Sequence, residues 1–248
     1  MMPVPMDNCS AVADITVTQT LGAFVPDATC PNAGTYKNTF IAEDGCGNTS
    51  GMFTQLITIT DDIAPTWASA VGSLDVALDC GDAAGLAAAE AMMPTPTDNC
   101  SASGDITITK TQGTLVAGSC PHIGTITNTF TATDECMNPT VAVFTQTITI
   151  TDNMVPTWTT VAGALDATLD CGDTAGLMAA QAMMPVASDN CSADADITVT
   201  KTAGTFVAGV CPNSGTYTNT FIAEDECSNM SVMFTQVIMV SDLSLIHI

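Results

Sequence analysis

Acidic and amide side chains stand beside cysteines at fixed places in this sequence, as in Asp98-Asn99-Cys100 and Asp134-Glu135-Cys136. Side-chain oxygens of this kind are the ligands that Ca²⁺ prefers, and it takes six to eight of them. The candidate calcium ligands form two sets: Asp61, Asp62, Asp98, Asn99, Asp134 and Glu135, and then Asp152, Asn153, Asp189, Asn190, Asp225 and Glu226. No EF-hand spacing is present. The alternative is a solvated acidic surface with local Asx turns and caps.

The charge of the chain excludes several classes of partner. The 248 residues contain 26 acidic side chains and 3 basic ones, which gives a net charge of −23. All three basic residues are lysines, so the footprint needed for nucleic acids or anionic membrane surfaces is missing. No apolar run approaches the length of a membrane span, and we expect no membrane insertion. Hydrophobic residues make up 46% of the chain, which is enough to form a core.

The eleven cysteines indicate disulfides and therefore an oxidising compartment. Zinc is the competing interpretation, but no Cys-x-x-Cys pair occurs and neighbouring cysteines are at least 16 residues apart. His122 is the only histidine before the last six residues, and no general base recurs between the repeats described next. We therefore expect no catalytic residues and no enzymatic activity.

The sequence repeats with a period of 91 residues, most clearly in the motif Asp-Asn-Cys-Ser at residues 7–10, 98–101 and 189–192. We predict a truncated repeat at residues 1–60 that lacks its first strand (repeat 1). Complete repeats follow at residues 61–151 (repeat 2) and 152–242 (repeat 3). Residues 243–248 resemble a translated sequencing adapter and are expected to be a non-native tail. The missing strand accounts for the odd number of cysteines, so the chain is expected to be an internal fragment of a longer protein, read from assembled environmental DNA.

Alternation of apolar and polar residues predicts several short strands in each repeat. In repeat 2 the pattern predicts strands at residues 74–79, 105–111, 124–133 and 141–151, and a short helical turn at residues 83–91. The isoleucines at 148 and 150 are expected on the buried face, with threonines on the solvent face. The predicted fold class is all-β: tandem immunoglobulin-like antiparallel β-sandwiches in a linear array, each with a short helical turn.

The recurring motifs resemble a known family. Asp-Asn-Cys-Ser, a threonine-rich strand, Thr-x-Asp-x-Cys-x-Asn, and Gln-x-Ile-Thr-Ile-Thr-Asp before a proline linker are similar to hyalin-type (HYR-like) immunoglobulin-like repeats of secreted and surface proteins of Bacteroidota-type bacteria. The resemblance covers all three repeats and implies an extracellular or cell-surface location. Repeat 2 departs from the pattern where Met137-Asn138-Pro139 replaces the Gly-Asn that repeat 1 keeps at Gly47-Asn48.

An immunoglobulin-like topology favours one of the three connectivities that four cysteines allow. Cys100 and Cys136 are expected at one pole of the sandwich, and Cys80 and Cys120 at the other. We therefore expect every disulfide to form within a single repeat. The expected pairs are Cys80–Cys120, Cys100–Cys136, Cys171–Cys211, Cys191–Cys227 and Cys9–Cys46, with Cys30 unpaired.

We expect the chain to be a non-catalytic, disulfide-stabilised stalk or spacer of an adhesin-like protein. Calcium at the junctions would be similar to the ions that stiffen cadherin linkers, and Trp67 and Trp158 are expected to pack there. One alternative is a module that binds an extracellular protein or glycan. Another is a set of accessory repeats of a secreted enzyme.

Overall fold

The computed structural model describes residues 2–211 and 213–242. The predicted tail at residues 243–248 lies outside this part of the chain. Close contacts divide the chain into two compact units, taken here over their described residues. The first unit contains Met1–Leu74, Met93–Gly113 and Asn128–Gln146, and the second contains Asp75–Met92, Thr114–Thr127 and Thr147–Ile248. Both units draw on residues 61–151, so the predicted repeat boundaries remain a prediction.

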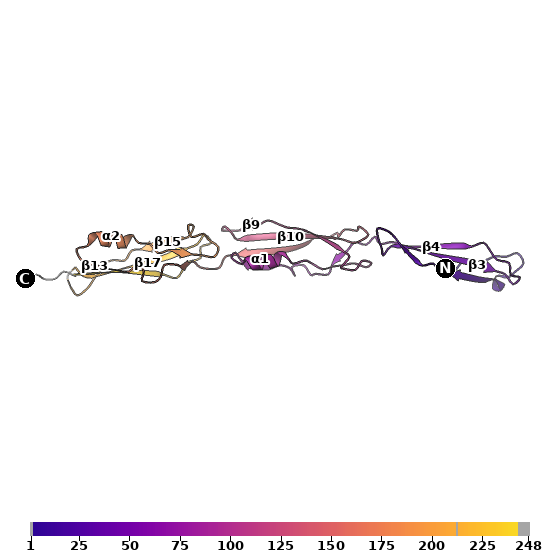
Figure 1. Cartoon of the computed structure of the whole chain (residues 1–248), viewed down its shortest axis with the longest axis horizontal. Coiled ribbons are helices and arrows are strands. Elements are labelled where there is room, and N and C mark those ends of the chain that lie inside the picture. The colour runs from indigo at the N-terminus through magenta and orange to yellow at the C-terminus, as the bar shows by residue number, and fades with distance from the viewer. Residues whose placement is uncertain (1, 212, 243–248) are drawn as a thin grey trace, which may run out of the picture. The chain divides into compact units, whose positions relative to one another are not determined.

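Repeat 2 forms two sheets and one short helix (Figure 1). A five-stranded sheet has the order β6-β11-β10-β8, with β9 also paired to β10, and β5 and β7 form a separate two-stranded sheet. The elements are β5 (Thr66–Trp67), β6 (Val76–Asp79), α1 (Ala83–Glu90), β7 (Pro96–Thr97), β8 (Thr107–Thr111), β9 (Val116–Ala117), β10 (Gly124–Thr133) and β11 (Phe144–Thr151).

Repeat 3 has the same elements in the same order, with the sheets β13-β18-β17-β15 plus β16, and β12-β14. They are β12 (Thr157–Trp158), β13 (Ala167–Asp170), α2 (Thr174–Ala182), β14 (Ala187–Ser188), β15 (Thr198–Thr202), β16 (Val207–Ala208), β17 (Gly215–Glu224) and β18 (Phe234–Ser241). The predicted all-β class is confirmed. One detail differs from the expected antiparallel sheets, because β6 runs parallel to β11 and β13 runs parallel to β18.

Repeat 1 has a four-stranded sheet, preceded by the 3-10 turn Val12–Asp14. Its strands are β1 (Thr16–Thr20), β2 (Phe24–Pro26), β3 (Gly34–Glu43) and β4 (Phe53–Ile59). Among the described residues no strand pairs with β4 as β6 pairs with β11. Phe53 of β4 is 54% exposed, whereas Phe144, at the same place in β11, is 4% exposed and packs against Trp67 of β5.

The core of repeat 2 follows the predicted alternation along β11. Ile148 and Ile150 are buried and lie with Ala89 of α1 in one apolar cluster. The helix begins after Asp82, whose side chain accepts a hydrogen bond from the Gly85 backbone N–H at 2.8 Å and caps the first turn. Asp173 caps α2 in the same way.

The two tryptophans make their contacts inside their own repeats, whereas packing at the junctions was expected. Trp67 contacts Phe144 with ring centroids 5.6 Å apart, and its Nε1–H donates to the Ala142 carbonyl at 2.8 Å. Trp158 makes the same contacts with Phe234 and the Val232 carbonyl. In both repeats this aromatic contact holds the two-stranded sheet against the larger one.

A buried asparagine–glutamine pair connects the middle strands in each repeat. Asn128 of β10 donates from Nδ2 to Oε1 of Gln146 at 2.9 Å, and both residues are fully buried. The amide of Gln146 then donates to the Leu74 carbonyl at 3.0 Å. Repeat 1 has the same pair, but its Gln55 is only half-buried.

Replacing Gln146 with leucine should destabilise repeat 2, because the Asn128 amide and the Leu74 carbonyl would stay buried without these partners. We expect a loss of about 2–4 kcal/mol of unfolding free energy. Urea denaturation followed by Trp67 fluorescence in a Trp158→Phe background would measure it. Gln55→Leu is the matched control and should cost far less, and equal losses would contradict this account.

Candidate metal centre and disulfide-bonded joints

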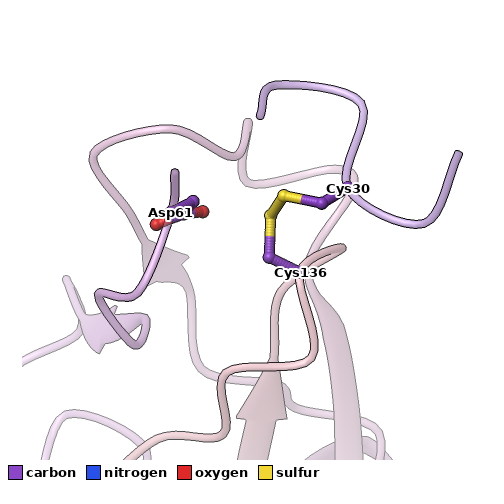
Figure 2. A group of neighbouring side chains, drawn as sticks. All are labelled: Cys30, Asp61 and Cys136. Atoms are coloured by element: carbon purple, nitrogen blue, oxygen red, sulfur yellow. A yellow bond between two sulfur atoms is a disulfide. The ribbon is translucent and has the colours of Figure 1, made fainter. Parts of the chain in front are cut away.

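Three disulfides join cysteines that are more than 100 residues apart in the sequence. They are Cys30–Cys136, Cys80–Cys191 and Cys120–Cys227, with Cα atoms 4.5, 5.8 and 5.2 Å apart. In every case the bond joins one repeat to the next. Figure 2 shows the first of them, between Cys30 of repeat 1 and Cys136 in the turn after β10.

This connectivity corrects the one expected from the sequence. The pairs Cys80–Cys120, Cys100–Cys136, Cys171–Cys211, Cys191–Cys227 and Cys9–Cys46 are wrong, and Cys30, expected to be unpaired, is bonded. A disulfide needs Cα atoms about 4.4–6.8 Å apart. The cysteine-bearing loops that meet this condition belong to consecutive repeats, which reasoning about a single immunoglobulin-like domain leaves out.

Five cysteines of the described chain are not bonded to another cysteine. Cys9, Cys46, Cys171 and Cys211 are exposed, and Cys100 is half-buried. All five had been expected to form disulfides within repeats.

Three carboxylates converge at the joint between repeats 1 and 2. Asp61 comes from the linker, Asp98 from the loop after β7, and Asp134 from the turn after β10. Each offers one oxygen to a group in which all the atoms lie within 4.8 Å of one another. Asp134 is buried and the other two are half-buried. The sequence had predicted this convergence of a linker with two loops.

The loop of Asp98 turns one carboxylate oxygen inward. Its Oδ2 accepts hydrogen bonds from the backbone N–H groups of Cys100 at 2.8 Å and Ser101 at 2.9 Å. Its Oδ1 is buried and has no hydrogen-bond partner in the described structure. Burial by itself raises the pKa of Asp98, but the hydrogen bonds from Ser101, Cys100 and Asn99 outweigh it and hold the pKa below its usual value. The side chain therefore stays ionised.

Asn138 connects the Asp134 carboxylate to the backbone of Asp61 in the linker. Its backbone N–H donates to Oδ1 of Asp134 at 2.8 Å, and its Nδ2 donates to Oδ2 of Asp134 at 3.0 Å and to the Asp61 carbonyl at 3.1 Å. Asp61 accepts from the Ile63 N–H through Oδ1, and its Oδ2 is buried with no partner among the described residues. The two residues with an unpartnered oxygen thus belong to the same cluster.

The turn that carries Asp134 keeps its shape although Met137 replaces glycine. Met137 has a φ of 69°, close to the 83° of Gly47 in repeat 1. This left-handed conformation is costly for a methionine. The spacing of Asp134 and Asn138 within Thr-x-Asp-x-Cys-x-Asn is thereby preserved, and it could have identified Asn138 as part of the site.

The joint between repeats 2 and 3 reproduces part of this arrangement, with two aspartates and Cys191 in the close group instead of three aspartates. Asp152 and Asp189 are close together, and each again has one buried oxygen without a partner in the described chain. Asn229 links Asp225 to the Asp152 carbonyl, as Asn138 does at the first joint. Burial, and then the charges of Asp189, Asp225 and Asp79, raise the pKa of Asp152 above its usual value. The same unpaired oxygens at two joints point to a cation site.

Four of the predicted acidic ligands are not part of these two groups. They are Asp62, Glu135, Asp225 and Glu226. The predicted amide ligands make other hydrogen bonds. Asn99 points its amide at the Cys100 sulfur, Asn153 donates to the Thr151 hydroxyl, and Asn190 donates to Asp79, a residue that the sequence interpretation missed. Neighbouring residues on a tight turn point apart, so at most one acid of each adjacent pair reaches the cluster.

The donor set suits a hard cation such as Ca²⁺. All the ligand atoms that converge at the first joint are carboxylate oxygens, and waters or second carboxylate oxygens would be needed to reach six to eight ligands. Zinc fits poorly. Cys30 and Cys136 lie near Asp61, but both sulfurs are in a disulfide, so neither is a thiolate ligand.

No protein-family model and no curated protein matches the sequence. Similar solved structures include protocadherin gamma B7 extracellular cadherin domains 1–4, at 14% identity and a TM-score of 0.34 over 92% of this chain and 66% of that one. The human desmocollin-1 ectodomain matches at 11% identity and 0.29, over 95% and 56%. Human CDH23 EC21-23 matches at 11% and 0.34, over 84% and 74%.

The thiol of Cys100 should report the charge of the first cluster. Burial, and then the charges of Asp61, Asp98 and Asp134, raise its pKa. At a given pH the thiolate fraction is therefore low, and alkylation by iodoacetamide without metal should need a higher pH than for an ordinary thiol. Asp134→Asn should lower the pKa and speed alkylation, whereas Asp225→Asn at the other joint should not. Equal effects of the two variants would contradict this electrostatic coupling.

Proposed function

We propose that this chain is a non-catalytic extracellular spacer whose repeats are covalently braced to one another. The observation that carries the proposal is that every disulfide of the described chain joins consecutive repeats. Such bonds persist in oxidising, extracellular surroundings. Domains joined by a flexible linker need no disulfide between them. A segment that must resist bending and extension does need such a bond.

The disulfides also give tension a short covalent route through the chain. Between Cys30 and Cys227 this route crosses to Cys136, runs back along β10 to Cys120, and crosses again. Only 16 residues of backbone lie on it, because Cys120 precedes Cys136 by that number. The linkers at Asp61 and Asp152 are bypassed, so pulling loads a central strand of repeat 2.

A cation at each joint would order the linker that the disulfides bypass. Metal-free, the clustered carboxylates repel one another, and this repulsion favours a linker that swings away. A bound Ca²⁺ would neutralise the charges and bind the linker carboxylate to two loops of the next repeat. The buried, unpartnered oxygens of Asp61, Asp98, Asp152 and Asp189 support this part of the proposal.

A glycan- or protein-binding module is the second candidate, and the aromatic residues argue against a glycan platform. Both tryptophans hold sheets together within their own repeats. The rings of Tyr36 and Tyr217 lie against Phe24 and Phe206, with centroids 5.1 Å apart in each case.

Within the described residues, no helix is long and apolar enough to cross a membrane.

Single-molecule stretching from the two ends tests the covalent bracing. Under oxidising conditions, the stretched distance between residues 30 and 227 should reach only about 50–60 Å, the reach of 16 residues. After reduction this distance should increase to about 700 Å, the reach of the whole segment. Cys30→Ser with Cys136→Ser is the control and should give an intermediate length. Full extension without reductant would contradict the proposal.

Calorimetric titration with CaCl₂ tests the cation sites. Asp61→Asn with Asp98→Asn should weaken one of two binding events at least 10-fold, because asparagine keeps the shape but removes two ligand charges. Asp152→Asn with Asp189→Asn should weaken the other event. The control is Asp14→Asn with Asp105→Asn, which removes two exposed carboxylates outside the clusters. If the first variant and this control gave the same heats, calcium would be excluded from the joint.

A further inference from the structure

Two of the three disulfides have an aspartate carboxylate beside them, and we infer that reduction of each of these bonds creates a zinc site at its joint. Each site has two cysteine sulfurs and one carboxylate oxygen, all within 4.8 Å of one another: Cys30, Cys136 and Asp61 in the first sulfur site, and Cys80, Cys191 and Asp79 in the second. The inference goes beyond the proposed spacer role and does not depend on calcium.

The second sulfur site has distances close to those of a tetrahedral zinc centre. Oδ1 of Asp79 lies 3.9 Å from the Cys80 sulfur and 3.9 Å from the Cys191 sulfur. Zinc binds thiolate sulfur at about 2.3 Å and carboxylate oxygen at about 2.1 Å, so a tetrahedral angle puts the oxygen about 3.6 Å from each sulfur. Small side-chain rotations are enough to close the remaining difference.

Hydrogen bonds from both sides of the joint hold the Asp79 carboxylate beside the sulfurs. Its Oδ1 accepts from the backbone N–H of Gly81 at 3.1 Å, and from Nδ2 of Asn190, which belongs to the next repeat. Hydrogen bonds of this kind fix the direction of a metal ligand before the metal binds. The carboxylate therefore stays in place when the two sulfurs separate.

The second sulfur site also has a fourth ligand within reach. Zinc in a structural site takes four ligands. Carboxylate oxygens of Asp152 and Asp189 lie within 4.8 Å of the Cys191 sulfur. Each of these side chains has one buried oxygen without a partner in the described chain. One of them can complete a site of two sulfurs and two oxygens.

At the first sulfur site the carboxylate comes from the linker. Figure 2 shows the Asp61 side chain beside the Cys30–Cys136 bond, on a segment separate from those of both cysteines. The Cys30 side chain is buried, and Oδ2 of Asp61 is buried with no hydrogen-bond partner among the described residues. Water would supply the fourth ligand here.

The redox state of the joint would select the cation that Asp61 binds. Asp61 also belongs to the carboxylate cluster with Asp98 and Asp134, which offers only hard oxygen ligands. Once Cys30 and Cys136 are reduced, two soft thiolates stand beside the same carboxylate. Thiolates favour zinc and are poor ligands for calcium.

Reduction and zinc binding together exchange a covalent clamp for a metal clamp. A dithiol reductant gives two electrons and two protons to the disulfide, which becomes two cysteine thiols, and the reductant leaves as its own cyclic disulfide. Zn²⁺ then binds the two thiolates, and the two thiol protons are released. Two thiolates on one zinc lie about 3.8 Å apart, a separation that rotation of the cysteine side chains supplies. The joint thus stays closed after the disulfide is lost.

The third disulfide provides an internal control. Cys120 and Cys227 belong to none of the close groups of potential metal ligands among the described residues. A reduced pair without a neighbouring carboxylate supplies only two of the four ligands that a structural zinc site needs. We therefore expect this pair to bind zinc much more weakly than the two sulfur sites.

Cobalt titration of the reduced full chain tests the inference, because Co²⁺ gives a sulfur-to-metal absorption band only when thiolates bind it. The five unbonded cysteines are first replaced with serine, namely Cys9, Cys46, Cys100, Cys171 and Cys211. After treatment with a dithiol and removal of the reductant under nitrogen, the band should saturate at two equivalents of Co²⁺. Zn²⁺ should then displace the Co²⁺. The oxidised chain should give no band.

Paired substitutions identify the sites. Replacing both cysteines of either sulfur site with serine should remove one of the two equivalents. The matched control is the third pair, Cys120→Ser with Cys227→Ser, which should remove neither. Asp79→Asn should weaken zinc binding at the second sulfur site at least 10-fold and leave the first site unchanged.

The three pairs also reveal an unfolded chain. If reduction unfolded the repeats, the pairs would become equivalent, and each paired variant would lose the same share of the band. Equal losses, no band in the reduced chain, or no effect of Asp79→Asn would therefore overturn the inference. Mapping the disulfides of the oxidised chain tests the proposed bracing separately, so failure of one proposal is distinguished from failure of the other.

Discussion

The pairing of each repeat with its neighbour through disulfides is the constraint on which the rest of the structure depends. A bond that closes a loop of about 100 residues is worth roughly 4–5 kcal/mol in the chain-entropy model. Here that stabilisation is shared, because each loop includes parts of two repeats. The division of the described chain into two compact units follows from this. Each unit contains a joint with its disulfides, and the change from one unit to the other falls inside repeat 2.

The acidic joints and the disulfides depend on the same loops. Asp134 and Asp189 lie two residues before the disulfide-bonded Cys136 and Cys191, and their carboxylates organise the turns that present those sulfurs. Charge and covalent chemistry are therefore not separate features of the sequence. The same hydrogen bonds that leave one Asp189 oxygen unpartnered also set the direction of the Cys191 backbone. Much of the net charge of −23 thus comes from acidic residues that recur at structural positions in each repeat, and not only from a solubilising surface.

The local sequence pattern predicted the strands and the short helix of repeat 2 well. Gly124–Thr133 forms a strand with the expected bounds, and the alanine-rich segment before Met92 forms the expected helix. Alternation specifies which side chains are buried, but it does not specify a strand's partner, so the parallel pairing of β6 with β11 could not be predicted. Disulfide connectivity had the same limitation. The spacing of cysteine classes is equally consistent with bonds within repeats and with bonds displaced by one repeat.

The candidate site was predicted in part for a related reason. The linker acid Asp61 and the loop acids Asp98 and Asp134 converge because the sequence places them at one pole of a sandwich. Asp62, Asn99 and Glu135 follow them directly and point elsewhere, which depends on backbone angles that a motif does not specify. Asn138 was missed because an amide that links a carboxylate to a backbone carbonyl of the linker resembles any other turn residue.

The overlap of the three disulfide loops has a consequence for survival among proteases. The loops span residues 30–136, 80–191 and 120–227, so every peptide bond from Cys30 to Cys227 lies inside at least one of them. A single cut anywhere in this stretch leaves both fragments covalently attached. From Cys80 to Cys191 every peptide bond lies inside at least two of the loops. A nicked chain would therefore still bear load, so one proteolytic event would not sever it.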